Sequence, residues 1–113
     1  MKFMLLICAD RNVELSQEEI SAMPARTDSW VKEMDGRGVR LDGDRLGPVS
    51  EATTVRLRGG EVLLGDGPFA ETKEQIGGYD ILECADLAEA IEVASKHPVA
   101  SFGTIEVRPF WVE

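Results

Sequence analysis

Several residue types that mark particular classes of protein are scarce in this sequence of 113 residues. It has two cysteines, one histidine and one tyrosine, and its 12 lysines and arginines are outnumbered by 21 aspartates and glutamates. Cys8 and Cys84 are too far apart for a Cys-x-x-Cys motif, and His97 has no second histidine to share a metal with. We therefore expect reduced thiols in a cytoplasmic protein, with no metal site and no cofactor.

The excess of acidic side chains gives the chain a formal charge of −9 at pH 7 and a pI near 4.6. Such a surface repels the phosphates of nucleic acids and the head groups of anionic lipids. The longest apolar run, residues 3–9, is also far shorter than the ~20 residues that a membrane-spanning helix needs. We therefore expect a soluble protein that binds neither nucleic acid nor membrane.

A chain of this length suits a single domain, residues 1–113, with a hydrophobic core of its own. Residues 2–9 form a predicted strand that is apolar on both faces, so each face needs a cover. Ser16 and Glu19 form a capping box at the start of a predicted helix that ends near Gly36. Pro24 lies inside this segment and indicates either a kinked helix or a short turn followed by a longer helix.

The rest of the chain alternates between turn signals and short β-favouring runs. Residues 39–48 are rich in glycine and aspartate and predict an exposed turn. Residues 53–57 and 61–64 flank a Gly-Gly pair and predict a tight hairpin. The remaining predicted elements are a polar loop over 66–78, a strand over 79–85, a helix capped by Asp86 and ending near Pro98, and a last strand over 103–112.

This order of elements predicts an α+β fold, namely a ferredoxin-like β-α-β-β-α-β antiparallel sheet with an extra hairpin. Two helices are enough to cover one face of such a sheet, yet the first strand is apolar on both faces. A second copy of the chain is the simplest cover for the other face. We therefore predict a homodimer.

Five stretches of the sequence together resemble one family of proteins. They are residues 1–7, 53–56, 66–79, 86–90 and 105–109. The longest of them begins with the tetrapeptide Asp66-Gly67-Pro68-Phe69. In these stretches, which extend over nearly the whole chain, the sequence resembles the YCII-related family, specifically its DGPF-domain branch.

This resemblance implies a dimeric α+β barrel, in agreement with the predicted homodimer, and a biochemical activity that is largely unassigned. Relatives in the wider YCII-related group are proposed enzymes because of a His–Asp pair whose histidine lies on the first helix. The comparable segment here, Met23-Pro24-Ala25-Arg26, contains no histidine. The resemblance therefore carries no catalytic histidine over to this chain.

The candidate site residues come from the polar loop and the strands beside it. We expect a ligand to contact Asp66, Phe69, Lys73, Tyr79 and Arg108, with Phe69 as an apolar wall. Lys73 and Arg108 are two of only four basic residues in the acidic second half of the chain, which makes them candidates for binding an anion. Asp66 and Glu71 are weak candidates for a catalytic base.

Each candidate also has a purely structural interpretation. Asp66 is typical of a turn, Glu71 and Lys73 of a solvated surface, and Arg108 of an ion pair with Glu106 or Asp80. His97, in the last turn of the second predicted helix, is typical of a cation that interacts with the helix dipole.

The leading functional hypothesis is that a small polar or anionic ligand binds in a cleft between the sheet and the partner subunit. The alternative is a cofactor-independent enzyme of isomerase, lyase or oxygenase type, in which Asp66 or Glu71 acts as the base. A third possibility is a purely structural or interaction dimer with a regulatory role.

Overall fold

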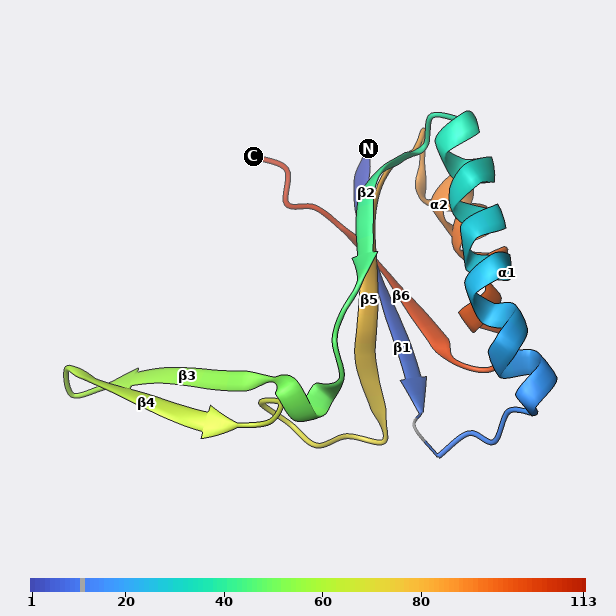
Figure 1. Ribbon diagram of the computed structural model, residues 1–113. Helices are drawn as coiled ribbons and strands as arrows, with labels where there is room; N and C mark the ends of the chain where they lie inside the picture. The colour runs from blue at the N-terminus through green and yellow to red at the C-terminus, as the bar shows by residue number, and fades with distance from the viewer. Residues whose placement is uncertain (11) are drawn as a thin grey trace.

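The computed structural model describes residues 1–10 and 12–113. It is an α+β fold in which the two helices lie on the same side of one antiparallel sheet, and a separate hairpin extends from the other side (Figure 1). The elements are β1 (Lys2–Asp10), α1 (Gln17–Gly36), β2 (Arg40–Arg45), the 3-10 turn η1 (Val49–Glu51), β3 (Thr53–Arg58), β4 (Glu61–Asp66), β5 (Glu74–Glu83), α2 (Leu87–Ser95), the 3-10 turn η2 (Pro98–Ser101) and β6 (Thr104–Pro109).

The main sheet has the strand order β2-β5-β1-β6, and β3 pairs with β4 in the hairpin. Every pairing within the main sheet is antiparallel. The ferredoxin-like prediction is therefore confirmed. In the described part of the chain, no helix is long and apolar enough to cross a membrane.

The hydrophobic core lies between the helices and one face of the sheet. Alternate residues of a strand point to opposite faces, and in β1 it is Phe3, Leu5 and Ile7 that are buried against the helices. Trp30 of α1 and Val93 of α2 are buried on the other side of this core. The alternation of side chains along β1 therefore determines which of its apolar residues the helices cover.

Within residues 1–10 and 12–113, no helix lies over the opposite face of the sheet (Figure 1). Met4 and Leu6 of β1 and Tyr79 and Ile81 of β5 alternate with the core residues, pair across the two strands and remain half-buried. We call this surface the open face. Its apolar character agrees with the prediction that β1 needs a cover on both sides.

The first predicted helix is a single helix, and the capping box between Ser16 and Glu19 is present at its start. Pro24 lies within α1 and does not divide it. A proline nitrogen has no hydrogen to donate, so the carbonyl of Ile20 loses its usual helical donor. The alternative of a short turn followed by a longer helix is wrong.

Two predicted loops prove to be partly strand. Residues 40–45, expected as an exposed turn, form edge strand β2, and the last five residues of the predicted 66–78 loop form the start of β5. Aspartate and glycine disfavour strands intrinsically, but pairing with the long central strand β5 outweighs that preference. The tight hairpin around Gly59 and Gly60 is confirmed, with both glycines at positive φ.

Candidate functional site

A cleft of about 770 Å³ lies between α1 and the helix-covered face of the sheet. We call it the α1–sheet cleft. Its walls include apolar side chains from β1, α1 and the η2 region, and its charged or titratable lining includes Asp28, Arg40, Asp44, Arg45, Asp80 and His97. A volume of this size is ordinary for a small-molecule site.

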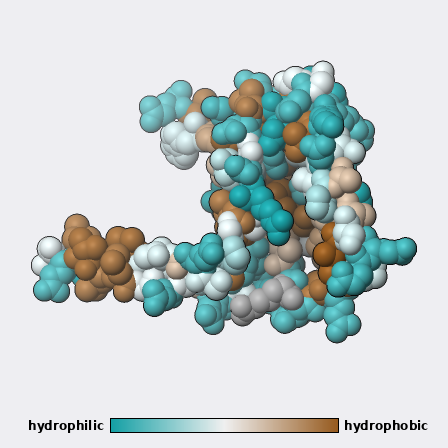
Figure 2. Space-filling model, viewed as in Figure 1, coloured by the Kyte–Doolittle hydropathy of each residue, from teal (hydrophilic) through white to brown (hydrophobic). Residues whose placement is uncertain are grey.

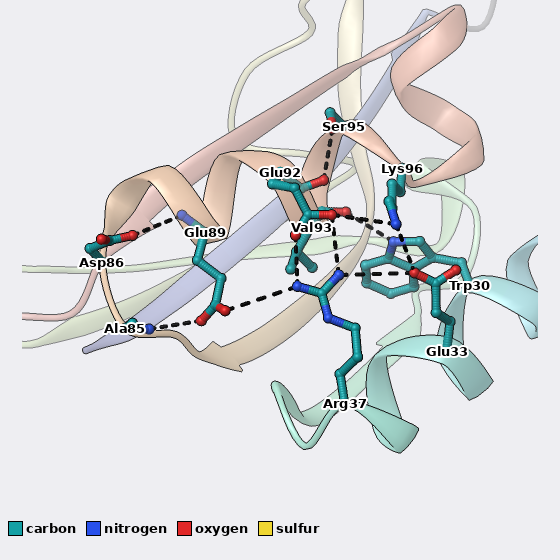
Figure 3. Close-up of polar contacts among 10 residues, drawn as sticks. All are labelled: Trp30, Glu33, Arg37, Ala85, Asp86, Glu89, Glu92, Val93, Ser95 and Lys96. Carbon is teal, nitrogen blue, oxygen red and sulfur yellow. Dashed lines mark hydrogen bonds and ion pairs between the residues drawn. The ribbon is translucent and has the colours of Figure 1, made fainter.

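The cleft exists because only the second half of α1 packs closely on the core. No residue of α1 before Trp30 is buried. From Trp30 onward the helix is tied to α2, since the Trp30 Nε1–H donates to the Val93 carbonyl at 3.0 Å. Arg37 pairs with Glu92 at 2.6 Å, and Lys96 pairs with Glu33 at 3.1 Å (Figure 3). The first half of α1 therefore lines the cleft and does not pack against the hydrophobic core.

Asp80 of β5 is the buried acid of this cleft, with 6% of its surface exposed. Arg40 Nε donates to Asp80 Oδ1 at 2.8 Å, and Arg40 Nη2 donates to the Gly43 carbonyl at 3.0 Å. Oδ2 of Asp80 has no hydrogen-bond partner among residues 1–10 and 12–113. Those residues contain no buried side-chain nitrogen or oxygen that lacks a partner, so Oδ2 must be accessible to solvent. Oδ2 is therefore open to a molecule in the cleft.

The surroundings of Asp80 favour its protonated form more than water does. Burial raises the pKa of this carboxyl above its ordinary value of 3.8, while the hydrogen bond and charge of Arg40 oppose the shift without cancelling it. A carboxyl with a raised pKa and one open oxygen is suited to exchange a proton with a ligand.

Gly43 of β2 provides the space for this ion pair. A Cβ atom at this position would overlap Asp80 Oδ1, and it would lie 2.7 Å from the Tyr79 carbonyl oxygen and 2.8 Å from Arg40 Nη2. We expect Gly43→Ala to lower the free energy of unfolding by about 1–3 kcal/mol, because the pair and the strand must shift to admit the methyl group.

The matched control is Gly36→Ala, since a Cβ at Gly36 meets no atom within 4 Å and its φ is not positive. Urea unfolding of both variants measures the difference. Equal stability of the two alanine variants would contradict the crowding at Gly43.

His97 lies at the start of η2 and is buried, with 6% of its surface exposed. Its Nδ1 accepts the Val99 N–H at 3.1 Å, and its ring lies edge-on to the Trp30 ring at a centroid distance of 4.7 Å. Burial lowers the pKa of His97 from 6.5 to about 4. The interpretation of His97 as a cation at the helix end is therefore wrong, because the imidazole is neutral at pH 7.

The neutral ring has a defined tautomer. Since Nδ1 is an acceptor, the single proton sits on Nε2. Nε2 has no hydrogen-bond partner in the described portion of the chain. Because no side-chain nitrogen or oxygen there is both buried and without a partner, Nε2 must be accessible to solvent. Because His97 also lines the α1–sheet cleft, its Nε2–H is available as a hydrogen-bond donor to a bound molecule.

The candidate residues between positions 66 and 73, which we call the DGPF segment, lie outside the α1–sheet cleft. Asp66 is exposed at the end of β4, Phe69 is 82% exposed, and Glu71 is exposed in the loop that follows. Lys73 is exposed, and its Nζ lies 3.8 Å from Asp10 Oδ2. Phe69 lines a second hollow of about 720 Å³ on the open-face side, together with Leu6, Cys8, Val49, Ile76 and Glu106. We call this hollow the elbow groove.

Tyr79 and Arg108 belong to strands of the main sheet. By strand alternation the Tyr79 side chain belongs to the open face, whereas Asp80 belongs to the helix-covered face. Arg108 is exposed and pairs with Glu106 at 2.9 Å, as its structural interpretation expected. Within one described chain, neither cavity is lined by Asp66 or Arg108, and Phe69 lines a different cavity from Tyr79.

Comparison with known proteins adds a family and a fold neighbour. A family model described as the YCII-related domain matches residues 1–112. An uncharacterized protein, R00369, of Rhizobium meliloti (strain 1021) is 40% identical over 100 residues, which cover 74% of this chain and 81% of that protein.

The fold neighbour is a solved structure of 5-chloro-2-hydroxyhydroquinone dehydrochlorinase (TftG) from Burkholderia phenoliruptrix AC1100, in complex with 2,5-dihydroxybenzoquinone. It superposes with a TM-score of 0.55 and 17% identity, covering 100% of this chain and 96% of that chain. The likeness shows a shared fold.

Proposed function

The chain belongs to the YCII-related domain family, and from this premise we propose that it binds a small polar or anionic organic molecule in the α1–sheet cleft, where Asp80 exchanges a proton with it. The observation that carries the proposal is the open Oδ2 of a buried carboxyl whose other oxygen is held by Arg40. A buried carboxyl with a fixed orientation and a free oxygen is the arrangement that general acid–base chemistry requires.

Three of the polar groups that line the cleft, those of Arg40, Asp80 and His97, have complementary roles in this proposal. Arg40 keeps Asp80 oriented and adds positive charge near the ligand. The His97 Nε2–H is neutral, so it donates a hydrogen bond to a ligand oxygen without giving up its proton at pH 7. Together they favour a ligand with a hydroxyl group that Asp80 deprotonates and an oxygen that accepts from His97.

The aromatic and apolar walls of the cleft favour a compact ring. Trp30, Val31 and Phe102 line it beside the polar groups. The fold neighbour TftG was solved with 2,5-dihydroxybenzoquinone, a small ring that carries two hydroxyl groups. We therefore favour a hydroxylated ring compound and a cofactor-independent proton transfer, in line with the enzyme alternative raised from the sequence.

The quaternary and cellular parts of the proposal rest on other features. The open face and its half-buried apolar side chains favour a homodimer. Both cysteines are free thiols, which suits a cytoplasmic protein. The tetrapeptide at residues 66–69 supports placement within the DGPF branch. The exposed candidates Asp66, Glu71, Phe69, Lys73 and Arg108 belong to a competing proposal, in which the ligand binds a surface that a second subunit completes instead of the α1–sheet cleft.

Titration with 2,5-dihydroxybenzoquinone tests the cleft. We expect this probe to raise the Tm of the wild-type protein and to bind Asp80→Asn at least tenfold more weakly. A hydrogen bond to a charged group contributes roughly 1.5–3 kcal/mol, and each 1.4 kcal/mol is about tenfold in affinity. Isothermal titration calorimetry gives the two dissociation constants.

Asp66→Asn is the matched control, because it makes the same chemical change at an exposed residue outside both cavities. Its affinity should equal that of the wild type. If Asp66→Asn weakens binding and Asp80→Asn does not, the ligand lies near the DGPF segment and the proposed role of Asp80 is wrong.

A further inference from the structure

The β3–β4 hairpin, residues 53–66, presents an apolar face that is exposed to solvent and does not pack on the described residues of its own chain. We call these residues the arm. Opposite residues of an antiparallel pair share a face, so the register places Val55 and Leu64 together and Leu57 and Val62 beside them. These four side chains are 63–71% exposed. The other face of the arm carries Arg56, Arg58, Glu61 and Leu63.

An isolated two-stranded hairpin is marginally stable in water. At the base of the arm its two strands are joined by two further hydrogen bonds, from the Gly67 N–H to the Ala52 carbonyl and from the Thr54 hydroxyl to the Gly67 carbonyl. Beyond this base it projects away from the rest of the chain, and hydrophobic residues cover much of its surface (Figures 1 and 2). Its amphipathic pattern therefore indicates a surface that packs on another molecule.

The arm shares its side of the molecule with two other uncovered apolar features. It projects from the side of the sheet away from α1 and α2, and the C-terminal end of the chain lies on the same side (Figure 1). That end carries Trp111 and Val112, which are 87% and 85% exposed. The open face lies between the arm and this end. One body seated against this side would cover all three features.

The solvent-accessible surface area of the chain is larger than that of a compact monomer of its mass, as expected for one subunit of an oligomer. The chain exposes 7868 Å², whereas a compact 12.4 kDa monomer exposes roughly 6100 Å². The radius of gyration is 16.1 Å, against about 13 Å for a compact chain of this length. The excess of roughly 1700 Å² per chain exceeds the ~800 Å² that one partner buries in a standard interface.

We propose that the arm is an intersubunit clasp, in which the apolar face formed by Val55, Leu57, Val62 and Leu64 packs against a second copy of this chain. This inference rests on the homodimer proposed above and names the segment that secures it. In a twofold dimer each copy both donates an arm and receives one. The elbow groove, which lies between the open face and the base of the arm, continues this surface.

The neutral charge of the arm allows it to pack on a second copy of this acidic chain. The chain carries −9 in total, yet the arm has two arginines, one glutamate and one aspartate and is neutral overall. Among the residues that line the elbow groove, the charged ones are Glu51, Glu74 and Glu106. A neutral apolar arm approaches such an acidic surface without the repulsion that two acidic surfaces have for each other.

Two adjacent leucines on opposite faces of the arm provide the test. Leu64→Asp places a charge on the apolar face, and Leu63→Asp places the same charge on the polar face. We expect the wild type to sediment as a dimer of about 25 kDa at micromolar concentration, twice the 12.4 kDa chain. Leu64→Asp should weaken dimerisation at least tenfold, and Leu63→Asp should leave the dissociation constant within about twofold.

If Leu64→Asp does not fold, hydrogen exchange of the wild type still tests whether the arm packs on a second copy. Amides of residues 54–65 should exchange more slowly when the protein concentration rises through the dissociation constant. A wild-type dimer in which these amides do not respond, or in which both aspartate variants behave alike, overturns the clasp and leaves the dimer standing. A monomeric wild type overturns both, whereas binding of the probe to the α1–sheet cleft tests Asp80 separately.

Discussion

Replacement of Arg40 with methionine is expected to lower the free energy of unfolding by about 3–5 kcal/mol at pH 7, the usual cost of removing one partner from a buried ion pair. The Arg40 side chain is 15% exposed and that of Asp80 8%, so solvent screens little of the loss. Without Arg40, the Asp80 carboxylate remains in a site where burial already raises its pKa. Urea unfolding followed by circular dichroism measures the change.

The sign of the pH dependence identifies the cause. Asp80 has a folded-state pKa above its unfolded value, and loss of Arg40 raises it further. The penalty in Arg40→Met is therefore largest at pH values where Asp80 is ionised in the folded wild type, and it shrinks as the pH falls through the raised folded-state pKa values of this carboxyl, which lie above 3.8. Stability curves of the variant and the wild type should converge toward acid pH.

The double variant Arg40→Met/Asp80→Asn separates charge from packing. With both charges gone, most of the lost stability should return, since neutral replacement of a whole buried pair is often tolerated. The coupling free energy between the two substitutions should therefore be large. Additive effects of the two single substitutions would show that Arg40 stabilises the fold by packing alone.

The regular elements were predictable because their signals are local. The capping box at Ser16, the N-cap at Asp86, the Gly-Gly turn and the apolar run at the start of the chain each depend on residues close together in sequence. Strand β2 was missed because nothing local favours it. Its Asp42, Gly43 and Asp44 form a strand through pairing with β5, which lies more than thirty residues away in sequence.

The candidate site could be predicted less well, because burial in the cleft depends on contacts between distant segments. Asp80 alternates with the buried Leu82 and Cys84, and that alternation was a readable signal of a buried carboxylate. Its partner Arg40 lies on β2, the strand that was missed, so the ion pair could not be anticipated. The tetrapeptide at residues 66–69 is a conspicuous motif in the sequence, but it lies outside the α1–sheet cleft.

A similar limit applies to His97. Its position before Pro98 suggested a helix C-terminus, where a histidine is usually charged. In the fold it follows the end of α2 and caps the next turn instead, with its ring against Trp30. The sequence contains no feature that distinguishes these two environments. They differ in the protonation state of the ring, which is open to direct measurement.

Acidification is expected to destabilise the protein through His97. Its folded pKa of about 4 lies below the 6.5 of the unfolded chain, so between these values the unfolded state binds the proton and the folded state does not. Stability is therefore full above pH 6.5 and falls as the pH decreases toward 4. From pH 7 to pH 4.5 this one group should remove roughly 2 kcal/mol, or about 30-fold in the unfolding equilibrium constant.

The variant His97→Asn isolates this contribution, because asparagine does not titrate and its side-chain oxygen can accept the Val99 N–H in place of Nδ1. Its free energy of unfolding should change less than that of the wild type over the same range, by roughly 2 kcal/mol. Asp80, with its raised pKa, acts in the opposite direction in acid, but it is present in both proteins and cancels from the difference. Since His97 is the sole histidine, its imidazole resonance reports the pKa directly. A midpoint near 6.5 in the folded protein would show that the ring is hydrated, and it would contradict the burial of His97 against Trp30.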